Sequence, residues 1–335
     1  MNQPPVALYS DPEGVEMTEA VALLRDAGFR VLVEDLRSEA ELIDRVAAAQ
    51  PAALLVTYLP ITEAVLSADA SLGIVSCSSV GFDHVDLAAA ERHGVWVCNV
   101  PDAATEEVAS SALAMALALV RHVPFLDRHV REGGWQYDAT GMPRRLSEVT
   151  LGVVGMGRIG RRLAGLAAGV FGRVVGCDPF VDGAGWPAEL PRVELDRCLR
   201  ESHVISLHLP LTPQTRGMID AAALARMGPG AFLVNVSRGG LIDEEALVAA
   251  LDSGHLAGAG LDVTEPEPPP AANPLRRHPR VLITPHAAWL SEPANEAYVM
   301  RQAENVAAWR RDGRPRTPVN HPRPLRAPGR QVQAG

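Results

Sequence analysis

The chain has 335 residues, of which 47% are hydrophobic and 21% are charged. This is enough material for a packed core and too much for one ordinary domain, so we expect two domains, and the composition excludes disordered, collagen-like and disulfide-scaffold proteins. Thirty-one basic and 40 acidic residues give a net charge of −9, which disfavours direct binding to nucleic acid, and the absence of any Lys excludes Schiff-base catalysis.

Four cysteines stand in or beside apolar runs without CxxC spacing: Cys77, Cys98, Cys177 and Cys198. We interpret them as buried free thiols in a reducing compartment rather than as disulfides or metal ligands. The first residues lack a basic, apolar leader pattern, and no segment has the roughly 20 apolar residues of a membrane span. We therefore expect a cytoplasmic protein with no metal site and no membrane partner.

In the first hundred residues, short apolar runs alternate with amphipathic helical segments. Strands are predicted at residues 6–9, 31–34, 53–57, 73–77 and 95–99, and helices at 14–26, 38–49, 61–68 and 86–92. Gly28 and Gly94 stand directly before strands, where they would terminate the preceding helices. This alternation predicts a parallel sheet covered on both faces, in a flavodoxin-like arrangement.

A long run of helix-forming residues at 105–135 opens a second domain. Thr105 is predicted as its N-cap, with Glu106 and Glu107 in the first turn, where the helix dipole favours acidic side chains. Strands then follow at 150–155, 173–178, 204–209, 231–237, 256–263 and 281–286, separated by helices that begin near residues 158, 195, 222 and 244. The second domain is therefore predicted to be a doubly wound Rossmann sheet, and the fold class is α/β throughout.

The helix predicted at residues 292–310 comes after the last strand of the second sheet and can return to the first domain. We therefore predict a discontinuous substrate domain, residues 1–101 plus 289–335, and a nucleotide-binding domain of residues 102–288, with the two crossings forming a hinge. The tail from residue 314 is rich in Pro and Arg, and we expect it to be an extended arm or disordered.

Residues 155–160 read GMGRIG, a GxGxxG pattern that contains Gly155, Gly157, Arg158, Ile159 and Gly160. A predicted strand precedes the pattern, a helix follows it, and Asp178 ends the next strand. The glycines let a pyrophosphate approach the backbone at a helix N-terminus, and the acidic side chain accepts ribose hydroxyls. The pattern predicts dinucleotide binding, with NAD favoured over NADP because Asp178 would repel a ribose phosphate.

Four later predicted strands each present polar residues at or near their ends: His208 in LHLPLT, which also contains Pro210, Arg238 in VNVSRGGLID, Asp262 and Glu267 in LDVTEPEP, and His286 in ITPHAAW. Because the carboxyl ends of parallel strands converge on the ligand crevice, we expect them to share one site. Arg238 suits capture of a carboxylate. His286 can carry the proton that accompanies hydride transfer, and Glu267 would stabilise its imidazolium. His208, Pro210 and Asp262 are assigned to the cofactor site.

These segments resemble the D-isomer-specific 2-hydroxyacid dehydrogenases. The resemblance runs through SSVGFDHVD at residues 78–86, NVPDAATEEVA, GMGRIG, HLPLTPQTRGMI, NVSRGGLIDEEAL, LDVTEPEP and TPHAAW. It implies that Arg238, Glu267 and His286 are the catalytic Arg, the acid partner and the general acid/base. It also implies that the amides of the loop with Ser79, Val80 and Gly81 help hold a substrate carboxylate, that Asp262 lies near the nicotinamide, and that the helical arm with Trp135 forms a dimer.

Within this family, PHAAWLSE, VGFDHVD and VCNVP are most similar to the C-terminal-binding-protein branch, which includes transcriptional corepressors and bacterial relatives. This likeness implies that Trp289 lines the substrate pocket. Cys77 stands where the corepressors carry an Arg aimed at the substrate, so it is also assigned to the substrate site. The SSVG segment is more similar to the glyoxylate/hydroxypyruvate reductases.

The sequence therefore predicts an NAD(H)-dependent, homodimeric oxidoreductase that interconverts a small 2-oxo acid and its D-2-hydroxy acid, with domain closure aligning the reactants. One alternative is an NADH-sensing dimeric binding protein of the corepressor type, with little turnover. Another is a biosynthetic reductase that acts on an unusual oxo acid.

Overall fold

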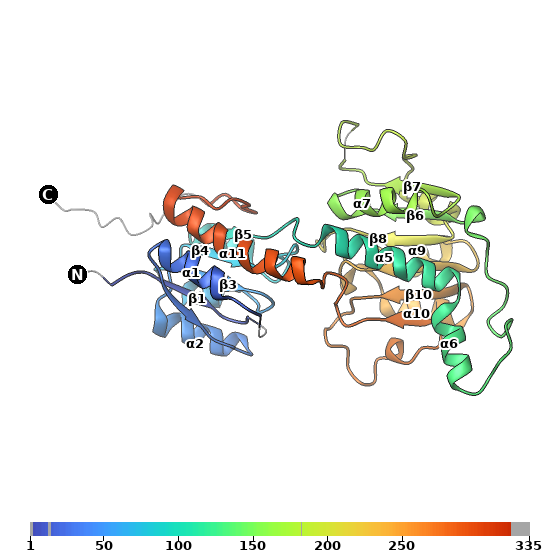
Figure 1. The fold of residues 1–335 in the computed structure, drawn as a ribbon, viewed down its shortest axis with the longest axis horizontal. Helices are drawn as coiled ribbons and strands as arrows, with labels where there is room; N and C mark the ends of the chain where they lie inside the picture. The colour runs from blue at the N-terminus through green and yellow to red at the C-terminus, as the bar shows by residue number, and fades with distance from the viewer. Residues whose placement is uncertain (1–2, 13–14, 182, 323–335) are drawn as a thin grey trace. The chain divides into compact units, whose positions relative to one another are not determined.

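The computed structural model describes residues 3–12, 15–181 and 183–322, and the chain divides into two compact units. The first unit comprises residues 1–103 and 291–335, and the second comprises residues 104–290. Each unit is built on a parallel sheet with helices on both faces (Figure 1), which confirms the predicted α/β class. The two observed crossings each lie two residues beyond the boundaries predicted from the sequence.

The first unit contains a sheet of strand order β2-β1-β3-β4-β5, the flavodoxin-like order. Its strands are β1 (Val6–Tyr9), β2 (Arg30–Val33), β3 (Ala53–Val56), β4 (Ile74–Cys77) and β5 (Trp96–Cys98). Its helices are α1 (Thr18–Asp26), α2 (Glu39–Ala49), α3 (Glu63–Ser67), α4 (Leu87–Arg92) and α11 (Glu292–Asp312). Gly28 and Gly94 follow α1 and α4 with φ of 87° and 68°, the left-handed conformation typical of a helix terminator.

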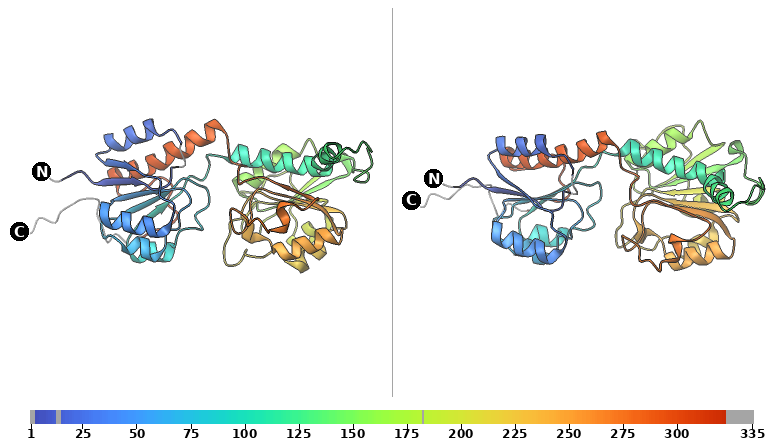
Figure 2. Two further views of the ribbon diagram at one scale, coloured as in Figure 1. Left: turned by 90° about the horizontal axis from the view of Figure 1, so that it is seen from below. Right: turned by 60° about the horizontal axis from the view of Figure 1, so that its bottom comes forward.

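Two helical layers cover the first sheet (Figure 2). Helices α1 and α11 pack on one face, and α2, α3 and α4 pack on the other. The return of α11 is secured by a buried amide, because Gln302 Nε2 donates to the carbonyls of Val56 (3.0 Å) and Ser76 (2.7 Å). The last predicted helix therefore does complete the first unit, 226 positions away in sequence from the strand that it covers.

The tail follows the edge of the first sheet after α11. Val319 N–H donates to the Val97 carbonyl (2.9 Å), while the Asn320 side chain accepts from Val97 N–H (2.8 Å) and donates to the Val95 carbonyl (3.0 Å). This part of the predicted extended arm is thus an ordered cover for the exposed edge of β5. Residues 323–335 lie outside the described part of the chain.

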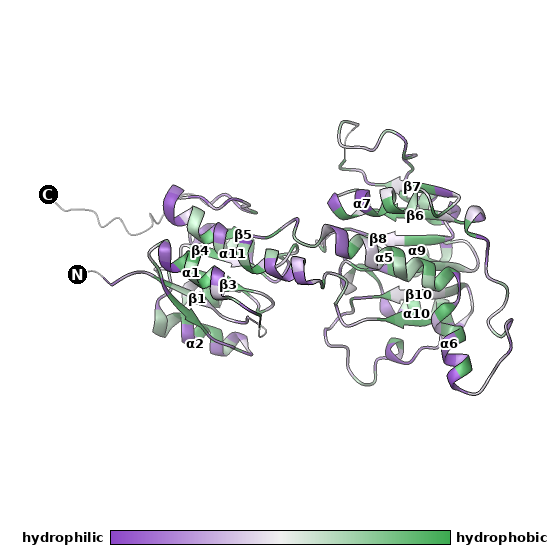
Figure 3. Cartoon of the chain, viewed as in Figure 1, coloured by the Kyte–Doolittle hydropathy of each residue, from purple (hydrophilic) through white to green (hydrophobic). Residues whose placement is uncertain are grey.

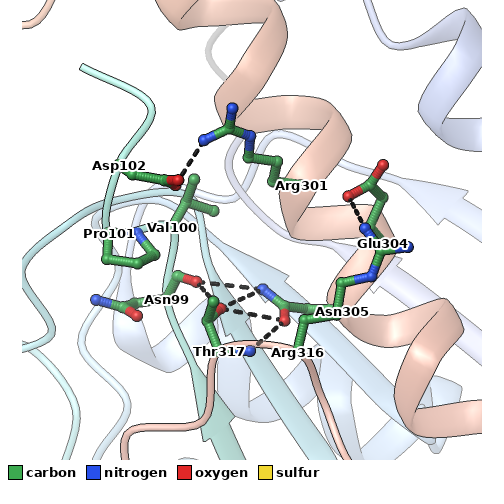
Figure 4. Close-up of a pocket in the computed structure, with 9 residues that line it drawn as sticks. All are labelled: Asn99, Val100, Pro101, Asp102, Arg301, Glu304, Asn305, Arg316 and Thr317. Carbon is green, nitrogen blue, oxygen red and sulfur yellow. Dashed lines mark hydrogen bonds and ion pairs between the residues drawn. The ribbon is translucent and has the colours of Figure 1, made fainter. Parts of the chain in front are cut away.

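A pocket of about 210 Å³ lies where the chain leaves the first unit (Figure 4). It is lined by Asn99, Val100, Pro101, Asp102, Arg301, Glu304, Asn305, Arg316 and Thr317. Arg301 pairs with Asp102 at 2.5 Å, and Arg316 pairs with Glu304. The Arg301–Asp102 pair therefore joins residues 99–102 to α11, and the Arg316–Glu304 pair joins the tail to the same helix.

The second unit contains a sheet of strand order β11-β10-β9-β8-β6-β7, with every pairing parallel. The strands are β6 (Thr150–Val154), β7 (Arg173–Cys177), β8 (Val204–Leu207), β9 (Ala231–Asn235), β10 (Leu256–Leu261) and β11 (Val281–Ile283). The helices are α5 (Thr105–Val120), α6 (Val123–Arg131), α7 (Arg158–Ala167), α8 (Leu195–Glu201), α9 (Ala221–Arg226) and α10 (Glu244–Asp252). The strand order reverses between β6 and β8, which is where ligands bind in open α/β sheets.

The core of the second unit lies on both faces of this sheet. Residues of α8, α9 and α10 join one apolar cluster beneath it, and α5 packs with α7 on the opposite face (Figure 2). The hydrophobic colouring in Figure 3 follows the strands, most of which are buried along their whole length. All four cysteines are buried free thiols, as the sequence predicts.

The predicted start of the second unit needs two corrections. Thr105 is the first helical residue of α5 rather than its N-cap; that position is Ala104, and no side chain caps it. The predicted helical run also breaks at Arg121 and His122, where His122 has a φ of 56°, and α5 and α6 are bent by 60°. No single helix among the described residues has the length and apolar composition of a membrane span, although the bent pair α5 and α6 meets both measures together.

Candidate active site

The GMGRIG turn follows β6 at the reversal of strand order. Gly155 has a φ of 96°, and a Cβ there would lie 2.3 Å from the His208 carbonyl oxygen, so the turn needs glycine for conformation and for space. A Cβ at Gly160 would lie 1.9 Å from the Gly155 carbonyl oxygen. Gly157 differs, because a Cβ there would meet nothing within 4 Å. Gly157, directly before Arg158 and Ile159 at the start of α7, thus leaves open space where a phosphate can approach the backbone.

Asp178 directly follows β7 beside this turn and is half-buried. Its carboxylate accepts hydrogen bonds from the Met156 amide inside the glycine turn and from the Phe180 amide, both at 2.8 Å. The predicted ribose-binding residue therefore also fastens the glycine turn to the end of the next strand. A carboxylate at this position fits NAD better than NADP.

His208 stands at the end of β8, next to the glycine turn. Burial lowers the pKa of its imidazole to about 3, so the ring is neutral. Its Nε2 lies 2.9 Å from Ser206 Oγ, while its buried Nδ1 has no hydrogen-bond partner among the described residues. Pro210 is exposed two residues further on. A buried polar atom without a partner at the strand reversal fits a site completed by a bound dinucleotide.

The loop after β9 carries Arg238 and is shaped by side chains at the strand end. Asn235 accepts from the Ser237 amide (3.0 Å) and donates to the Arg238 carbonyl (2.8 Å), while Ser237 Oγ donates to the Leu207 carbonyl at the end of β8 (2.8 Å). A Cβ at Gly239 would lie 2.1 Å from the Thr264 carbonyl carbon, so this loop packs tightly against the loop after β10. The half-buried Arg238 is thus held beside the segment that carries Glu267.

Glu267 and His286 form a direct hydrogen bond. His286 Nδ1 lies 2.6 Å from Glu267 Oε2, and the Thr264 amide donates to Glu267 Oε1 at 3.0 Å. Burial acts to raise the pKa of Glu267, but the hydrogen bond and charge of His286, the Thr264 amide and the charge of Arg238 hold this pKa below its ordinary value. Glu267 is therefore a carboxylate at neutral pH, and its Oε2 can accept a hydrogen bond from the Nδ1–H of His286.

Asp262 organises the loop that presents His286. Its carboxylate is 2% exposed and accepts from Thr284 Oγ1 (2.5 Å) and from the Ala287 and Ala288 amides (2.9 Å each). Its backbone carbonyl accepts from the His286 amide (2.8 Å), and His286 has a φ of 52°, a left-handed conformation uncommon outside glycine. Asp262 therefore holds the His286 loop, a role that sequence reasoning missed when it assigned this residue only to the nicotinamide.

The second unit thus gathers most of the predicted site residues at the carboxyl edge of one sheet. Arg238, Glu267 and His286 extend from β9, β10 and β11, and the half-buried Trp289 follows them. Sequence reasoning missed Asn235, Thr264 and Thr284, which shape the loops that carry these residues. The available signal was a polar residue at or just after the end of an apolar strand.

The predicted substrate loop belongs to the first unit, after β4. Its carbonyls are engaged: Ser79 O accepts from the Val100 amide (2.9 Å), Val80 O from Asn99 Nδ2 (2.7 Å) and Gly81 O from Ser79 Oγ (2.6 Å). The amides of Ser79, Val80 and Gly81 donate to no acceptor within the described part of the chain. Three neighbouring amides left open in this way match the expected carboxylate-binding loop.

The assignment of Cys77 to the substrate site is wrong. Its side chain is 0% exposed and packs in the apolar cluster between the first sheet and helices α2, α3 and α4. Burial raises the pKa of this thiol well above its ordinary value. The residue ends β4 with its side chain turned into the core, because neighbouring residues of a strand face opposite sides of the sheet.

Comparison with known proteins identifies the second unit. Residues 113–288 match the family described as D-isomer specific 2-hydroxyacid dehydrogenase, NAD binding domain. A glyoxylate reductase of Korarchaeum cryptofilum is 40% identical over 273 residues, which cover 78% of this chain and 80% of the relative. A D-3-phosphoglycerate dehydrogenase of Synechocystis is 36% identical over 304 residues, or 88% of this chain and 52% of the relative, so the chain spans about half the length of that protein.

The fold as a whole also matches solved structures. The structure of D-lactate dehydrogenase from Aquifex aeolicus, complexed with NAD and lactic acid, superposes with a TM-score of 0.82 at 29% sequence identity. The match covers 95% of this chain and all of the other chain, so both units belong to the comparison. These three relatives lend no support to the corepressor-type sensor.

Proposed function

Since the chain belongs to the D-isomer specific 2-hydroxyacid dehydrogenase family, we propose that it reduces a small 2-oxo acid to the D-2-hydroxy acid, and catalyses the reverse reaction, with NAD(H) as its cofactor. The observation that carries the proposal is the hydrogen bond of 2.6 Å between His286 Nδ1 and Glu267 Oε2, at the same sheet edge as Arg238. This arrangement supplies a proton donor, a group that keeps it protonated and a cation for a carboxylate.

The cofactor is NAD(H), and the second unit is the family's NAD-binding domain. The space at Gly157, the helix N-terminus of α7 and the carboxylate of Asp178 would hold its pyrophosphate and adenosine ribose. The neutral His208 offers a buried ring nitrogen beside the glycine turn without adding a positive charge there. When bound, NADH supplies the hydride that reduces the substrate carbonyl.

Arg238 would bind the substrate carboxylate and polarise the adjacent carbonyl, because its guanidinium presents several donors to oxygen. His286 would give the proton on its ring to the developing alkoxide, and would take it back during oxidation. Glu267 would stabilise the imidazolium until that transfer. The loop of Asp262 would keep His286 in the left-handed conformation that aims its ring, so the donor is in place before substrate arrives.

Glyoxylate and hydroxypyruvate are the first substrates to test. One relative carries the name glyoxylate reductase and is matched over 80% of its length, and the SSVG loop resembles the same enzymes. Lactic acid is bound in the Aquifex aeolicus structure, so pyruvate is the next candidate. The Synechocystis relative, named for phosphoglycerate, is about twice as long as the match, which makes phosphorylated substrates a separate arm of the test.

We further propose that the protein is a homodimer joined through α6 and the segment that follows it. Trp135, Tyr137 and Met142 are 84%, 85% and 80% exposed, and Val123 and Val130 add further apolar surface. Analytical ultracentrifugation of Trp135→Ser/Tyr137→Ser should yield monomers if this arm joins two copies. The four unbonded cysteines support a reducing compartment such as the cytoplasm, and the net charge of −9 supports a small acid rather than nucleic acid as the partner.

The decisive experiment follows NADH oxidation with glyoxylate, hydroxypyruvate, pyruvate, branched and aromatic 2-oxo acids and a phosphorylated oxo acid, with NADPH as a control. We expect turnover on one class, preference for NADH, and loss of turnover in His286→Ala with NADH binding retained. Tight NADH binding without turnover on any of these acids would contradict the proposed function.

A further inference from the structure

An ion pair beside the site has no role in the proposed function. Arg216 lies between β8 and α9, and its Nη1 donates to both carboxylate oxygens of Glu265, at 2.9 and 2.8 Å. Glu265 stands two residues before Glu267, on the loop after β10. The pair therefore joins the segment after β8 directly to the loop that carries the acid partner of His286.

This ion pair also crosses the loop that carries Arg238. A Cβ at Gly240 would lie 2.3 Å from Glu265 Oε2 and 3.0 Å from Arg216 Nη1, so both charged groups rest on the backbone of that loop. From the other direction, the Gly217 amide donates to the Gly240 carbonyl (2.8 Å), and the Ile219 amide donates to the Leu241 carbonyl (3.0 Å). The Arg238 loop is thus enclosed between the residue 217–219 segment and the ion pair.

Glu265 is held from a second side as well. Its backbone amide donates to Glu244 Oε1 (3.0 Å) at the start of α10, and the other oxygen of Glu244 accepts from Asn273 Nδ2 (2.8 Å). Gly239 packs against the backbone of Thr264 and Glu265. A displacement of Glu265 would therefore move the Arg238 loop and the Glu267 loop relative to each other.

We propose that Arg216 and Glu265 are positioning residues, which hold Arg238 at a fixed position relative to the Glu267–His286 pair. The proposal rests on the proposed function, since it concerns how that site is assembled. Arg216 and Glu265 are 56% and 46% exposed, so the pair adds little to overall stability. Its effect falls on geometry, because a small shift of Arg238 against His286 misaligns the carboxylate-binding group and the proton donor.

Arg216→Ala and Glu265→Gln in the full chain test this proposal, with Arg173→Ala as the matched control. Arg173 pairs with Glu201 at 3.1 Å with exposures of 42% and 37%, but it lies at the amino end of β7, away from the site edge. We expect kcat to fall about two- to fivefold in both test variants, the range open to an exposed pair. We also expect the alkaline limb of the pH profile to move to lower pH, and residues 236–243 and 262–268 to exchange amide hydrogens faster.

The charge-swapped variant Arg216→Glu/Glu265→Arg provides the rescue, and it should recover part of kcat and of the wild-type pH profile. If Arg216→Ala does not fold, Arg216→Lys replaces it, with a smaller loss expected because Lys keeps the charge without the planar fork. The proposal is overturned if Arg216→Ala behaves like Arg173→Ala, or if the two loops exchange faster while kcat and the pH profile stay unchanged.

Hydrogen exchange separates this proposal from the proposed function. If the wild-type protein turns over none of the acids, the proposed function fails. The exchange rates of the two loops then still decide whether Arg216 and Glu265 hold them together. Equal exchange in Arg216→Ala and Arg173→Ala would overturn the positioning role independently of any turnover.

Discussion

Substitution of Asp262 by Ala tests most directly how this site is built. The carboxylate accepts one hydroxyl and two amide hydrogen bonds from the loop that carries His286, in a place that is 2% exposed. Without it, Thr284 Oγ1 and the amides of Ala287 and Ala288 lose their acceptor. The left-handed φ of 52° at His286 then keeps only the backbone bond to the Asp262 carbonyl and the pairing with Glu267, while the residues that follow it in the loop are released.

The size of the effect follows from the number of bonds. A hydrogen bond to a charged group contributes about 1.5 to 3 kcal/mol, and water that enters the vacated space restores part of the loss. We expect the free energy of unfolding of the second unit to fall by about 3 to 5 kcal/mol. For a unit of this size, such a loss corresponds to a Tm lower by about 10 °C. Misplacement of His286 should lower kcat by about 100-fold.

Calorimetry and steady-state kinetics check this prediction, with Asp220→Ala as the control. Asp220 accepts a single amide hydrogen bond as the N-cap of α9, at 2.8 Å from the Ala223 amide, so its loss should cost about 1 kcal/mol and leave kcat unchanged. We expect NADH affinity to stay near the wild-type value in Asp262→Ala. If kcat and NADH affinity fall together while Tm drops no further than in Asp220→Ala, the carboxylate acts on the cofactor, and the positioning argument is refuted.

Three further predictions concern the cofactor turn, the acid pair and the tail. Gly157→Ala should weaken NADH binding, measured by fluorescence titration, and leave Tm unchanged. Gly155→Ala should lower NADH affinity and Tm together, because Gly155 has a φ of 96° and a Cβ there would lie 2.3 Å from a backbone oxygen. In Glu267→Gln the alkaline limb of the pH profile for reduction should move to lower pH, because the negative charge beside the imidazolium is gone. The folded pKa of Glu267 is lowered, so the stability that its ionised form contributes is present above the ordinary pKa of Glu and is lost as pH falls through the lowered value. The free energies of unfolding of wild type and variant should therefore converge on acidification. Asn320→Ala removes one hydrogen bond to Val97 in β5 and one to Val95 just before it, at a site 3% exposed. It should lower the free energy of unfolding of the first unit, measured by calorimetry, by about 1 to 3 kcal/mol and leave the second unit unaffected.

The elements of this chain were predictable because their signals are local. Short apolar runs between amphipathic helical segments marked the strands, and the turn GMGRIG carried its own strand, helix and Asp178. The end of a strand is also a local feature, so the residues that follow β9, β10 and β11 could be named before their neighbours were known. Prediction was weaker at helix ends, where Thr105 has the right chemistry for an N-cap but the chain becomes helical one residue too early for it.

The tertiary structure decided which of those residues touch and which way they face. Cys77 is the last residue of an apolar strand, where a substrate residue could lie, yet its thiol is enclosed in the core. The pairing of Glu267 with His286 was predicted from residue types at strand ends, but its distance of 2.6 Å was not, and the contact of Asp262 with an amide 26 positions away has no sequence signal. The partners of Gln302 and Asn320 lie more than 200 positions away. Residue types and strand ends are properties of a segment, whereas distances, burial and a left-handed φ at His286 arise only when separate segments pack together and supply the hydrogen bonds that hold them.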